Sequence, residues 1–223
     1  MNSFVVTIDG PAGSGKSTVS AMLAKRLKFR FLTTGAFYRG LAILCSQKNA
    51  DLHDAAAVVR LVEKPGIQVT ADENGTQVRI EGKNVSDQLN SEKVAAIASK
   101  ISSIPEVRKA LLQAQREFQS TGGLIAEGRD CGTVVFPDAQ VKIFLTANLD
   151  TRVMRRSIEV KSSNSNDLAK DLANRDQADT QRKVAPLSKA IDAVEIDTSS
   201  LSIGQVADRI EAIVRDKWRQ HKI

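Results

Sequence analysis

The stretch Asp9-Gly10-Pro11-Ala12-Gly13-Ser14-Gly15-Lys16-Ser17-Thr18 matches a phosphate-binding loop at every fixed position of that motif. An apolar, β-branched run at residues 4–9 precedes it, and apolar side chains recur at helical spacing over residues 16–28. Strand, glycine loop and helix are the context that such a loop needs, because backbone N–H groups and a helix N-terminus then surround an anion. A glycine-rich turn that happens to precede a helix is the disfavoured alternative.

The loop predicts a site for a nucleoside triphosphate, with ATP as the favoured one. The Lys16 ammonium group can bridge the terminal phosphates, and the Ser17 hydroxyl can ligate Mg²⁺. The residues predicted to bind ATP are Gly10, Pro11, Ala12, Gly13, Ser14, Gly15, Lys16, Ser17 and Thr18.

The composition of the chain is that of an ordinary globular protein with a basic surface. It has 223 residues and a net charge of +6, with 42% hydrophobic and 26% charged residues. The length favours one large domain, or one domain with an insert. The positive charge suits an anionic substrate or a nucleic acid. Because aromatic residues are only 4% and the arginines stand singly or in pairs beside glycines and aspartates, discrete phosphate groups are favoured over a nucleic acid.

Cysteines and apolar runs bear on the expected location. Cys45 and Cys131 are too few for a disulfide framework and lack metal-ligand spacing, which favours a reducing cytosol. The N-terminus lacks the basic and cleavage regions of a signal peptide, and no apolar run approaches the length of a membrane span. We therefore expect a cytoplasmic protein without a membrane partner.

Alternation of strand and helix patterns predicts a three-layer α/β fold around a parallel sheet. Residues 67–69 and 77–81 alternate apolar with polar around Asn74-Gly75, which predicts a β-hairpin in an inserted subdomain. Residues 162–166 are polar and predict a loop or hinge. Further strands are expected at 123–126, 141–145 and 194–197, and helices at about 35–48, 53–64, 91–102, 105–120, 150–161, 168–181 and 203–218.

Other nucleotide-binding classes fit less well than a small-molecule kinase. A GTPase needs a guanine-reading Asn-Lys-x-Asp, which is absent, and residues 72–75 (DENG) are better interpreted as the hairpin turn. A helicase-type motor needs further domains and an apolar strand that ends in an Mg²⁺-linked aspartate, of which no clear example is found. A kinase needs only a second site that faces the phosphate loop and a means of excluding water.

Three clusters of residues are candidates for that second site. They are residues 33–39 (TTGAFYR), residues 127–130 (EGRD), and Arg175-Asp176-x-x-Asp179-x-x-Arg182. In the last cluster, the spacing of four and three predicts that Arg175, Asp179 and Arg182 share one helix face. Each has an ordinary alternative: a helix surface, a salt-bridged strand end, and a solvated helix with i,i+4 pairs. Their occurrence together behind a phosphate loop favours a second phosphate site at the carboxyl ends of the strands.

The motifs of this chain resemble those of bacterial cytidylate kinases, in the P-loop nucleoside monophosphate kinase superfamily. The resemblance runs nearly the full length and includes the β-rich insert after Pro65. It is carried by residues 8–18, Thr34-Gly35-Ala36-x-Tyr38-Arg39, Gly128-Arg129-Asp130-x-Gly132-Thr133-Val134-Val135-Phe136-Pro137-Asp138-Ala139, and Arg175-Asp176-x-x-Asp179-x-x-Arg182-x-Val184-Ala185-Pro186-Leu187.

The resemblance implies a P-loop kinase fold with a monophosphate-binding subdomain and a mobile helical lid. We expect the protein to be a monomer. The chain would form a single domain, 1–223. Residues 1–34, 121–149 and 187–223 would be its core, 35–120 the monophosphate-binding region with a β-rich insert at about 66–90, and 150–186 the lid. The implied activity transfers the γ-phosphate of ATP to CMP or dCMP, giving ADP and CDP or dCDP, with Mg²⁺ as cofactor.

The resemblance also implies roles for individual residues. Arg39, Arg129 and Arg182 would bind the CMP phosphate, Asp179 the ribose, and Arg175 the transferring phosphate. Asp130 would accept a hydrogen bond from the amino group of cytosine, and Arg108 and Ser99 would donate hydrogen bonds to its O2 and N3 acceptors. The full implied CMP set is Thr34, Tyr38, Arg39, Ser99, Arg108, Arg129, Asp130, Asp179 and Arg182, and the catalytic set is Lys16, Arg129, Arg175 and Arg182. The family usually has aspartate where Thr33 stands, so Thr33 is given no role.

Two other functions stay open at this point. The nearest alternative is a P-loop kinase of another nucleoside monophosphate, such as UMP, or of another small acceptor. A more distant one is an ATP-dependent protein that binds nucleic acid through its positive charge, which steep salt dependence of binding would reveal.

Overall fold

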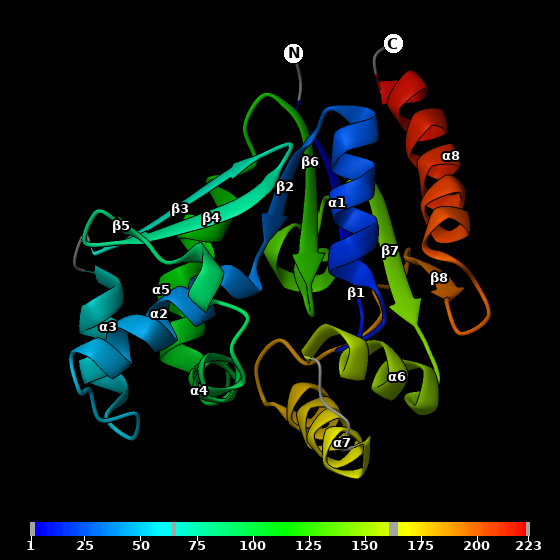
Figure 1. Cartoon of the computed structure of the whole chain (residues 1–223). Coiled ribbons are helices and arrows are strands. Elements are labelled where there is room, and N and C mark those ends of the chain that lie inside the picture. Colours follow the sequence, from blue (N-terminus) through cyan, green and yellow to red (C-terminus); the bar gives the residue numbers. More distant parts are fainter. Residues whose placement is uncertain (1–2, 64–65, 161–164, 222–223) are drawn as a thin grey trace.

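The computed structural model describes residues 3–63, 66–160 and 165–221, and a five-stranded sheet forms its centre (Figure 1). In spatial order the strands are β2 (Arg30–Thr33), β6 (Gly122–Gly128), β1 (Ser3–Asp9), β7 (Val141–Thr146) and β8 (Val194–Asp197). Each pairing in this sheet is parallel. Val6 of β1, for example, lies opposite Ile125 of β6 and Val141 of β7. The parallel sheet predicted from the sequence is confirmed, and the strands all end at one edge.

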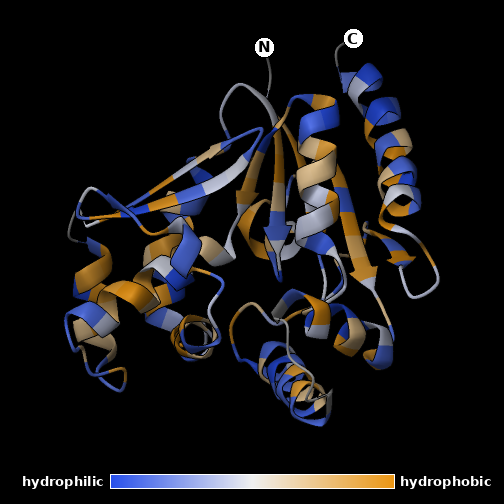
Figure 2. Ribbon diagram, viewed as in Figure 1, coloured by the Kyte–Doolittle hydropathy of each residue, from blue (hydrophilic) through white to orange (hydrophobic). Residues whose placement is uncertain are grey.

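Both faces of the sheet are covered at its centre, which explains why β1 and β6 are buried over most of their length. Val6 packs in one hydrophobic layer with α1 and α8, whereas Val5 points to the opposite face and packs in a second layer with α2 and α5. Figure 1 shows α1 and α8 side by side over one face, and Figure 2 shows the central strands in mostly hydrophobic colours. The helices are α1 (Lys16–Leu27), α2 (Gly35–Gln47), α5 (Pro105–Arg116) and α8 (Ile203–His221).

The predicted hairpin is part of a smaller antiparallel sheet. Asp72 accepts a hydrogen bond from the backbone N–H of Asn74 at 2.7 Å, which stabilises the turn. The hairpin tip also contacts the main sheet, because the Thr76 hydroxyl donates to the Phe31 carbonyl at 2.9 Å and accepts from the Thr33 N–H at 2.7 Å. Its strands are β3 (Ile67–Asp72), β4 (Gly75–Ile80) and β5 (Lys83–Asn84).

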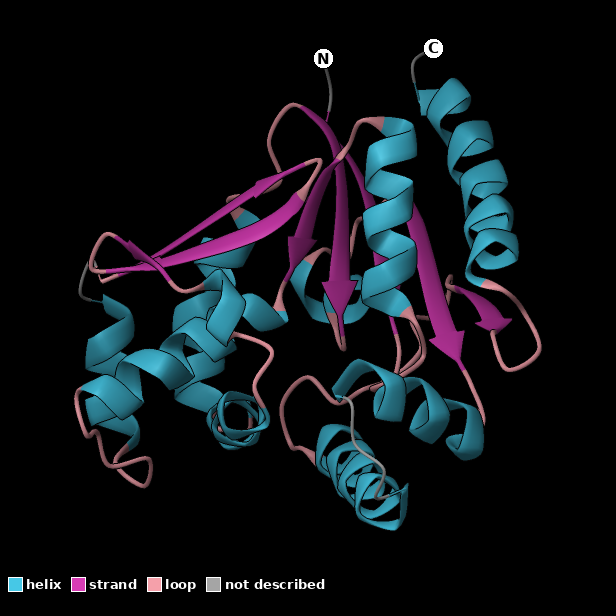
Figure 3. Ribbon diagram, viewed as in Figure 1, coloured by secondary structure: helices cyan, strands magenta, loops and turns pink. Residues whose placement is uncertain are grey.

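The remaining helices lie on two sides of the strand ends. Helices α3 (Ala55–Glu63) and α4 (Glu92–Ser102) lie with α2 and α5 beside the hairpin, and α6 (Leu149–Val160) and α7 (Ser165–Gln181) lie beyond the carboxyl ends of the strands. Figure 3 shows loops gathered at those strand ends, between the two groups of helices. Among the described residues, no helix is long and apolar enough to cross a membrane.

Some predicted boundaries were wrong. The helix predicted at 105–120 ends at Arg116, because the chain turns there towards β6, and Phe118 packs edge-on against Phe37 with ring centroids 5.9 Å apart. Of the loop predicted at 162–166, residues 162–164 lie outside the described part, and Ser165 and Asn166 belong to α7. Lys64 and Lys161, the last residues of two other predicted helices, also lie outside it.

Candidate active site

A cavity of about 510 Å³ lies at the carboxyl ends of the strands, between the phosphate loop, α2, α4, α6 and α7. Side chains from all three clusters singled out in the sequence line it. From the predicted sets these are Ala12, Gly13, Lys16, Ser17, Thr34, Tyr38, Arg39, Ser99, Arg108, Arg129, Asp130, Arg175, Asp179 and Arg182. The structure therefore brings the predicted catalytic and CMP-binding residues into one cavity with the phosphate loop.

The phosphate loop requires glycine because of its backbone and its close neighbours. Gly13 and Gly15 have positive φ angles of 76° and 90°. Gly10 has a φ of 150°, and a side chain there would lie 2.1 Å from the backbone carbonyl oxygen of Leu145. The loop backbone is thus free to approach a phosphate closely, as the sequence motif indicates.

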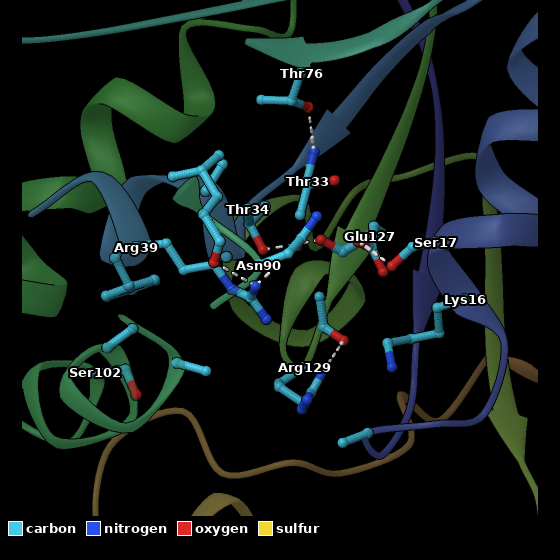
Figure 4. A pocket seen from close by; sticks show the side chains of 18 of the residues that line it. Lys16, Ser17, Thr33, Thr34, Arg39, Thr76, Asn90, Ser102, Glu127 and Arg129 are labelled. Atoms are coloured by element: carbon cyan, nitrogen blue, oxygen red, sulfur yellow. Dashed lines mark hydrogen bonds between the residues drawn. The ribbon is translucent and has the colours of Figure 1, made fainter. Parts of the chain in front are cut away.

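Lys16 lies at the start of α1 and is buried. Its ammonium group donates to the Pro11 carbonyl at 2.7 Å and to the Ser14 hydroxyl at 3.4 Å, so it folds back over its own loop. Burial lowers the pKa of Lys16 to about 7, and the nearby Arg129 contributes in the same direction. An anion in the cavity would favour the charged form of this lysine. Figure 4 shows Lys16 and Arg129 approaching each other across the cavity.

Ser17 has a partner to which the sequence analysis gave no role. Its hydroxyl donates to the Glu127 carboxylate at 2.8 Å, and Glu127 is buried near the end of β6 (Figure 4). An acid near the end of the apolar strand β6 is the sequence signal for this contact, and it was missed because aspartate was expected at that place. Two oxygen donors of this kind suit Mg²⁺. No group of three His, Cys, Asp or Glu side chains in the described ranges could hold a metal, so nucleotide or water oxygens would be needed as well.

Asp9 connects the phosphate-loop strand to the residues that follow Arg129. Its carboxylate accepts the backbone N–H groups of Cys131 and Gly132 at 2.9 and 2.7 Å. These belong to a wide turn with i→i+5 hydrogen bonds, such as Phe136 N–H to the Cys131 carbonyl at 2.7 Å. Burial raises the pKa of Asp9 to about 6 despite these bonds. Neither this turn nor the hydrogen bonds that Asp9 makes to it were predicted from the sequence.

Asp130 forms a buried ion pair with Arg108. The Arg108 guanidinium donates to one carboxylate oxygen of Asp130, and Arg182 contacts the other at 3.4 Å. Arg108 also lies over the Tyr38 ring, 5.4 Å from its centroid. Because these side chains are buried, they present hydrogen-bond donors and an acceptor in a region of low dielectric, where an unmatched ligand group is costly.

Asp179 holds the two arginines that flank it in space. Arg129 donates to it at 2.6 Å, and Arg182 lies 3.7 Å away. Arg129 directly follows β6, whereas Asp179 lies in α7, so this ion pair joins the strand end to the helix. Arg182 follows the end of α7 at Gln181, so the prediction that a single helix face carries all three residues of that cluster was wrong. They nevertheless line the same cavity.

The other predicted residues contact neighbours around the cavity rim. Arg39 donates to the Leu89 carbonyl at 2.7 Å and to the Asn90 side chain at 3.0 Å. The Thr34 hydroxyl donates to the Glu127 backbone carbonyl at 3.0 Å, which joins α2 to β6. Thr33 lines the cavity, and its N–H is bound by Thr76 in the hairpin.

This combination of fold and site defines a class. A phosphate loop with a buried lysine, a serine–glutamate pair, and facing arginines at the carboxyl ends of a parallel sheet are the features of a P-loop kinase. A gluconokinase from Sinorhizobium meliloti has the same fold, with a TM-score of 0.51 and 12% identity over 96% of this chain and 92% of that one. At that identity the likeness supports the fold alone.

Within this class, the chain belongs to the cytidylate kinase family. The family model described as cytidylate kinase matches residues 6–216. The cytidylate kinase of Bdellovibrio bacteriovorus is 47% identical over 214 residues, which cover 96% of this chain and 98% of that protein. The cytidylate kinase of a Geobacillus species is 42% identical over 220 residues, with 97% and 98% covered.

Proposed function

We propose that this protein transfers the γ-phosphate of ATP to CMP or dCMP, giving ADP and CDP or dCDP. The observation that carries the proposal is the single cavity in which Lys16 of the phosphate loop faces Arg129 and Arg182. Membership of the cytidylate kinase family supports the choice of nucleotides. ATP, CMP and dCMP are thus its proposed ligands.

On the donor side, the phosphate loop binds ATP through its backbone N–H groups and the N-terminus of α1. The loop glycines leave room for this close approach, as the position of Gly10 beside the Leu145 carbonyl requires. When ATP binds, the Lys16 ammonium group leaves the Pro11 carbonyl and donates to the terminal phosphates instead. It can then stay in contact with the γ-phosphoryl group during transfer.

Mg²⁺ is the proposed cofactor, and Ser17 with Glu127 would hold it. The fit rests on the chemistry of the donors, since a hydroxyl and a carboxylate lie in hydrogen-bond contact beside the phosphate loop. When bound, the ion would neutralise charge on the donor phosphates. Glu127 is also close enough to Lys16 for its charge to favour the ammonium form.

On the acceptor side, arginines bind the CMP phosphate and a buried polar group reads the base. Arg39, Arg129 and Arg182 supply guanidinium groups that suit phosphate oxygens. Asp130 accepts a hydrogen bond from the amino group of cytosine, while Arg108 and Ser99 donate hydrogen bonds to the acceptors of the cytosine ring. Asp179 binds the ribose, and Thr34 and Tyr38 complete the lining.

The transfer itself is a direct in-line displacement. A phosphate oxygen of CMP attacks the γ-phosphorus, the bond to the β–γ bridging oxygen breaks, and ADP leaves. The attacking oxygen is already ionised near neutral pH, so no strong general base is required. Catalysis then depends on positioning and on the charges of Lys16, Arg129, Arg175 and Arg182 around the transferring group.

The division of the chain into regions belongs to the same proposal. Residues 1–34, 121–149 and 187–223 form the core, 35–120 bind the monophosphate, and 150–186 act as a lid that excludes water. We expect a monomer. We also expect it in the reducing cytoplasm, in keeping with two buried cysteines that form no disulfide.

An ADP-release assay with CMP, dCMP, UMP, AMP and GMP tests the proposal directly. We expect CMP or dCMP to give the highest kcat/KM, with a requirement for Mg²⁺ that EDTA reveals. Preferential turnover of another monophosphate would overturn the choice of acceptor. ATP hydrolysis that no monophosphate accelerates would overturn the kinase itself.

A further inference from the structure

Glu92 connects the two groups of helices that border the cavity. It is the first residue of α4, and its two carboxylate oxygens bind different arginines. Arg175 of α7 donates to one oxygen at 2.5 Å, and Arg156 of α6 donates to the other. These arginines lie 83 and 64 residues from Glu92 in the chain, so the contact joins distant segments. We call this set of three side chains the Glu92 clasp.

The clasp leaves donors of Arg175 available to the cavity. Only the terminal nitrogen Nη2 of Arg175 takes part, and within residues 3–63, 66–160 and 165–221 Glu92 is its one ion-pair partner. A guanidinium group has five N–H donors in a fixed plane, so fixing one nitrogen orients the others. Arg175 and Arg156 both line the cavity, with side chains 23% and 11% exposed, respectively.

Glu92 also offsets a concentration of positive charge. Burial chiefly lowers the pKa of Arg39, and three neighbouring guanidinium groups lower it further. Those groups belong to Arg129, Arg156 and Arg175. If Glu92 loses its charge, Arg129 keeps its pair with Asp179 and Arg156 its pair with Glu159, whereas Arg175 loses its one ion-pair partner in the described ranges. Partial burial raises the pKa of Glu92, but its bonds to Arg156 and Arg175 outweigh this, and the net pKa lies below the usual range.

We propose that Glu92 is a positioning residue that holds Arg175 at the mouth of the cavity and ties α4 to α6 and α7. It acts through Arg175, which the proposed function assigns to the transferring phosphate, so this inference rests on that function. Glu92 itself touches neither nucleotide in this scheme. Its loss should therefore affect the transfer step and the order of α7 more than ATP binding.

The test compares Glu92→Gln with Glu92→Asp and with Glu106→Gln as the matched control. Glu106 lies in the first turn of α5, is exposed, and has no ion-pair partner among the described residues, so its substitution reproduces the loss of a helix-start carboxylate. We expect Glu92→Gln to lower kcat with CMP about three- to tenfold, with KM for ATP within about twofold of the wild type, since such pairs are partly buried. Glu92→Asp, which keeps the charge on a shorter side chain, should retain an intermediate kcat.

Two further measurements separate positioning from a general structural effect. In an Arg175→Lys background, Glu92→Gln should lower kcat less than it does in the wild type, because the residue through which it acts has already changed. In the protein without nucleotide, hydrogen exchange of α7 amides should speed up in Glu92→Gln, but not in Glu106→Gln, with α1 unchanged.

The proposal is overturned if Glu92→Gln matches the wild type in both kcat and α7 exchange, or if Glu106→Gln gives equal losses. An equal loss in the two Arg175 backgrounds would also overturn it. A wild-type protein that fails to phosphorylate CMP would refute the proposed function instead, and the exchange comparison would still decide whether the clasp holds α7.

Discussion

The phosphate loop and the acceptor side of the cavity are built in different ways. The loop is one continuous stretch between β1 and α1, and its shape depends on backbone angles that glycine permits, as at Gly13 and Gly15. The acceptor side is assembled from side chains of separate segments, several of which hold one another by ion pairs, such as Arg129 with Asp179 and Arg108 with Asp130. A site made of backbone tolerates the loss of most side chains, whereas a site made of ion pairs loses its order when one charge is removed.

Lys16 is the exception in the loop, since its function lies in a side chain. Lys16→Met should lower kcat by about a thousandfold or more, because the transferring phosphoryl group loses its moving charge. The fold should survive, since a buried cation is replaced by an apolar group of similar length. Steady-state kinetics and thermal unfolding measure the two effects, with the exposed Lys25→Met as control. A well-folded Lys16 variant with near-normal kcat would contradict the assignment.

Arg182 tests the acceptor side in the same manner. Its side chain is only 5% exposed and contacts both Asp130 and Asp179, so Arg182→Ala should lower kcat/KM for CMP about 10- to 100-fold. An exposed pair contributes about 0–1 kcal/mol, and Arg60→Ala, which breaks the exposed pair with Asp54, provides that comparison. Equal and slight effects of the two variants would show that Arg182 does not take part in binding CMP.

Asp130 tests how the acceptor side recognises a base. Asp130→Asn replaces an acceptor with an amide that can donate to the carbonyl of uracil. We expect CMP turnover to fall and the UMP-to-CMP ratio of kcat/KM to rise about tenfold. Initial rates of ADP formation with CMP, dCMP and UMP measure the ratio in both proteins. If all three rates fall by one factor, Asp130 serves to hold Arg108 and Arg182 rather than to read the base.

The smallest expected effect concerns protonation in the loop. The pKa of Lys16 is about 7 in the free protein and should rise when phosphates bind, so ATP binding at pH 7 should take up about half a proton. The contribution of Lys16 to ATP affinity should therefore be constant well below pH 7. Relative to that value, the affinity should be about twofold lower at pH 7 and should fall further as the pH rises. Calorimetry in buffers of different ionisation enthalpy gives the uptake, and Lys16→Met corrects for protons that ATP itself releases. Equal uptake in both proteins would contradict the lowered pKa.

The same contrast explains what the sequence could reveal. The phosphate loop, the parallel sheet and the hairpin are local patterns, and the structure confirms them. The pairing of Asp130 with Arg108 depends on the packing of α5 against the turn that follows β6, which no local pattern contains. Asp130 belongs to the cluster at residues 127–130 that the sequence itself indicates, whereas only the family resemblance led to Arg108. Glu127 near the end of an apolar strand is a local signal that was missed, although its contact with Ser17 spans 110 residues of the chain. The contact of Asp9 with the turn at Cys131 has no local signal, because it joins segments 122 residues apart.

The two buried cysteines have a practical consequence. Burial raises the pKa of Cys45 to about 11 and that of Cys131 well above its usual range, so almost no thiolate, the reactive species, is present near neutral pH. The native protein should react only slowly with maleimides, and both thiols should become titratable after unfolding. A cysteine introduced at Met154, which is 57% exposed on α6, could then carry a fluorophore without removal of either native thiol. The fluorescence of a dye at this position would then report on the surroundings of α6, beside the cavity, as nucleotides bind and dissociate.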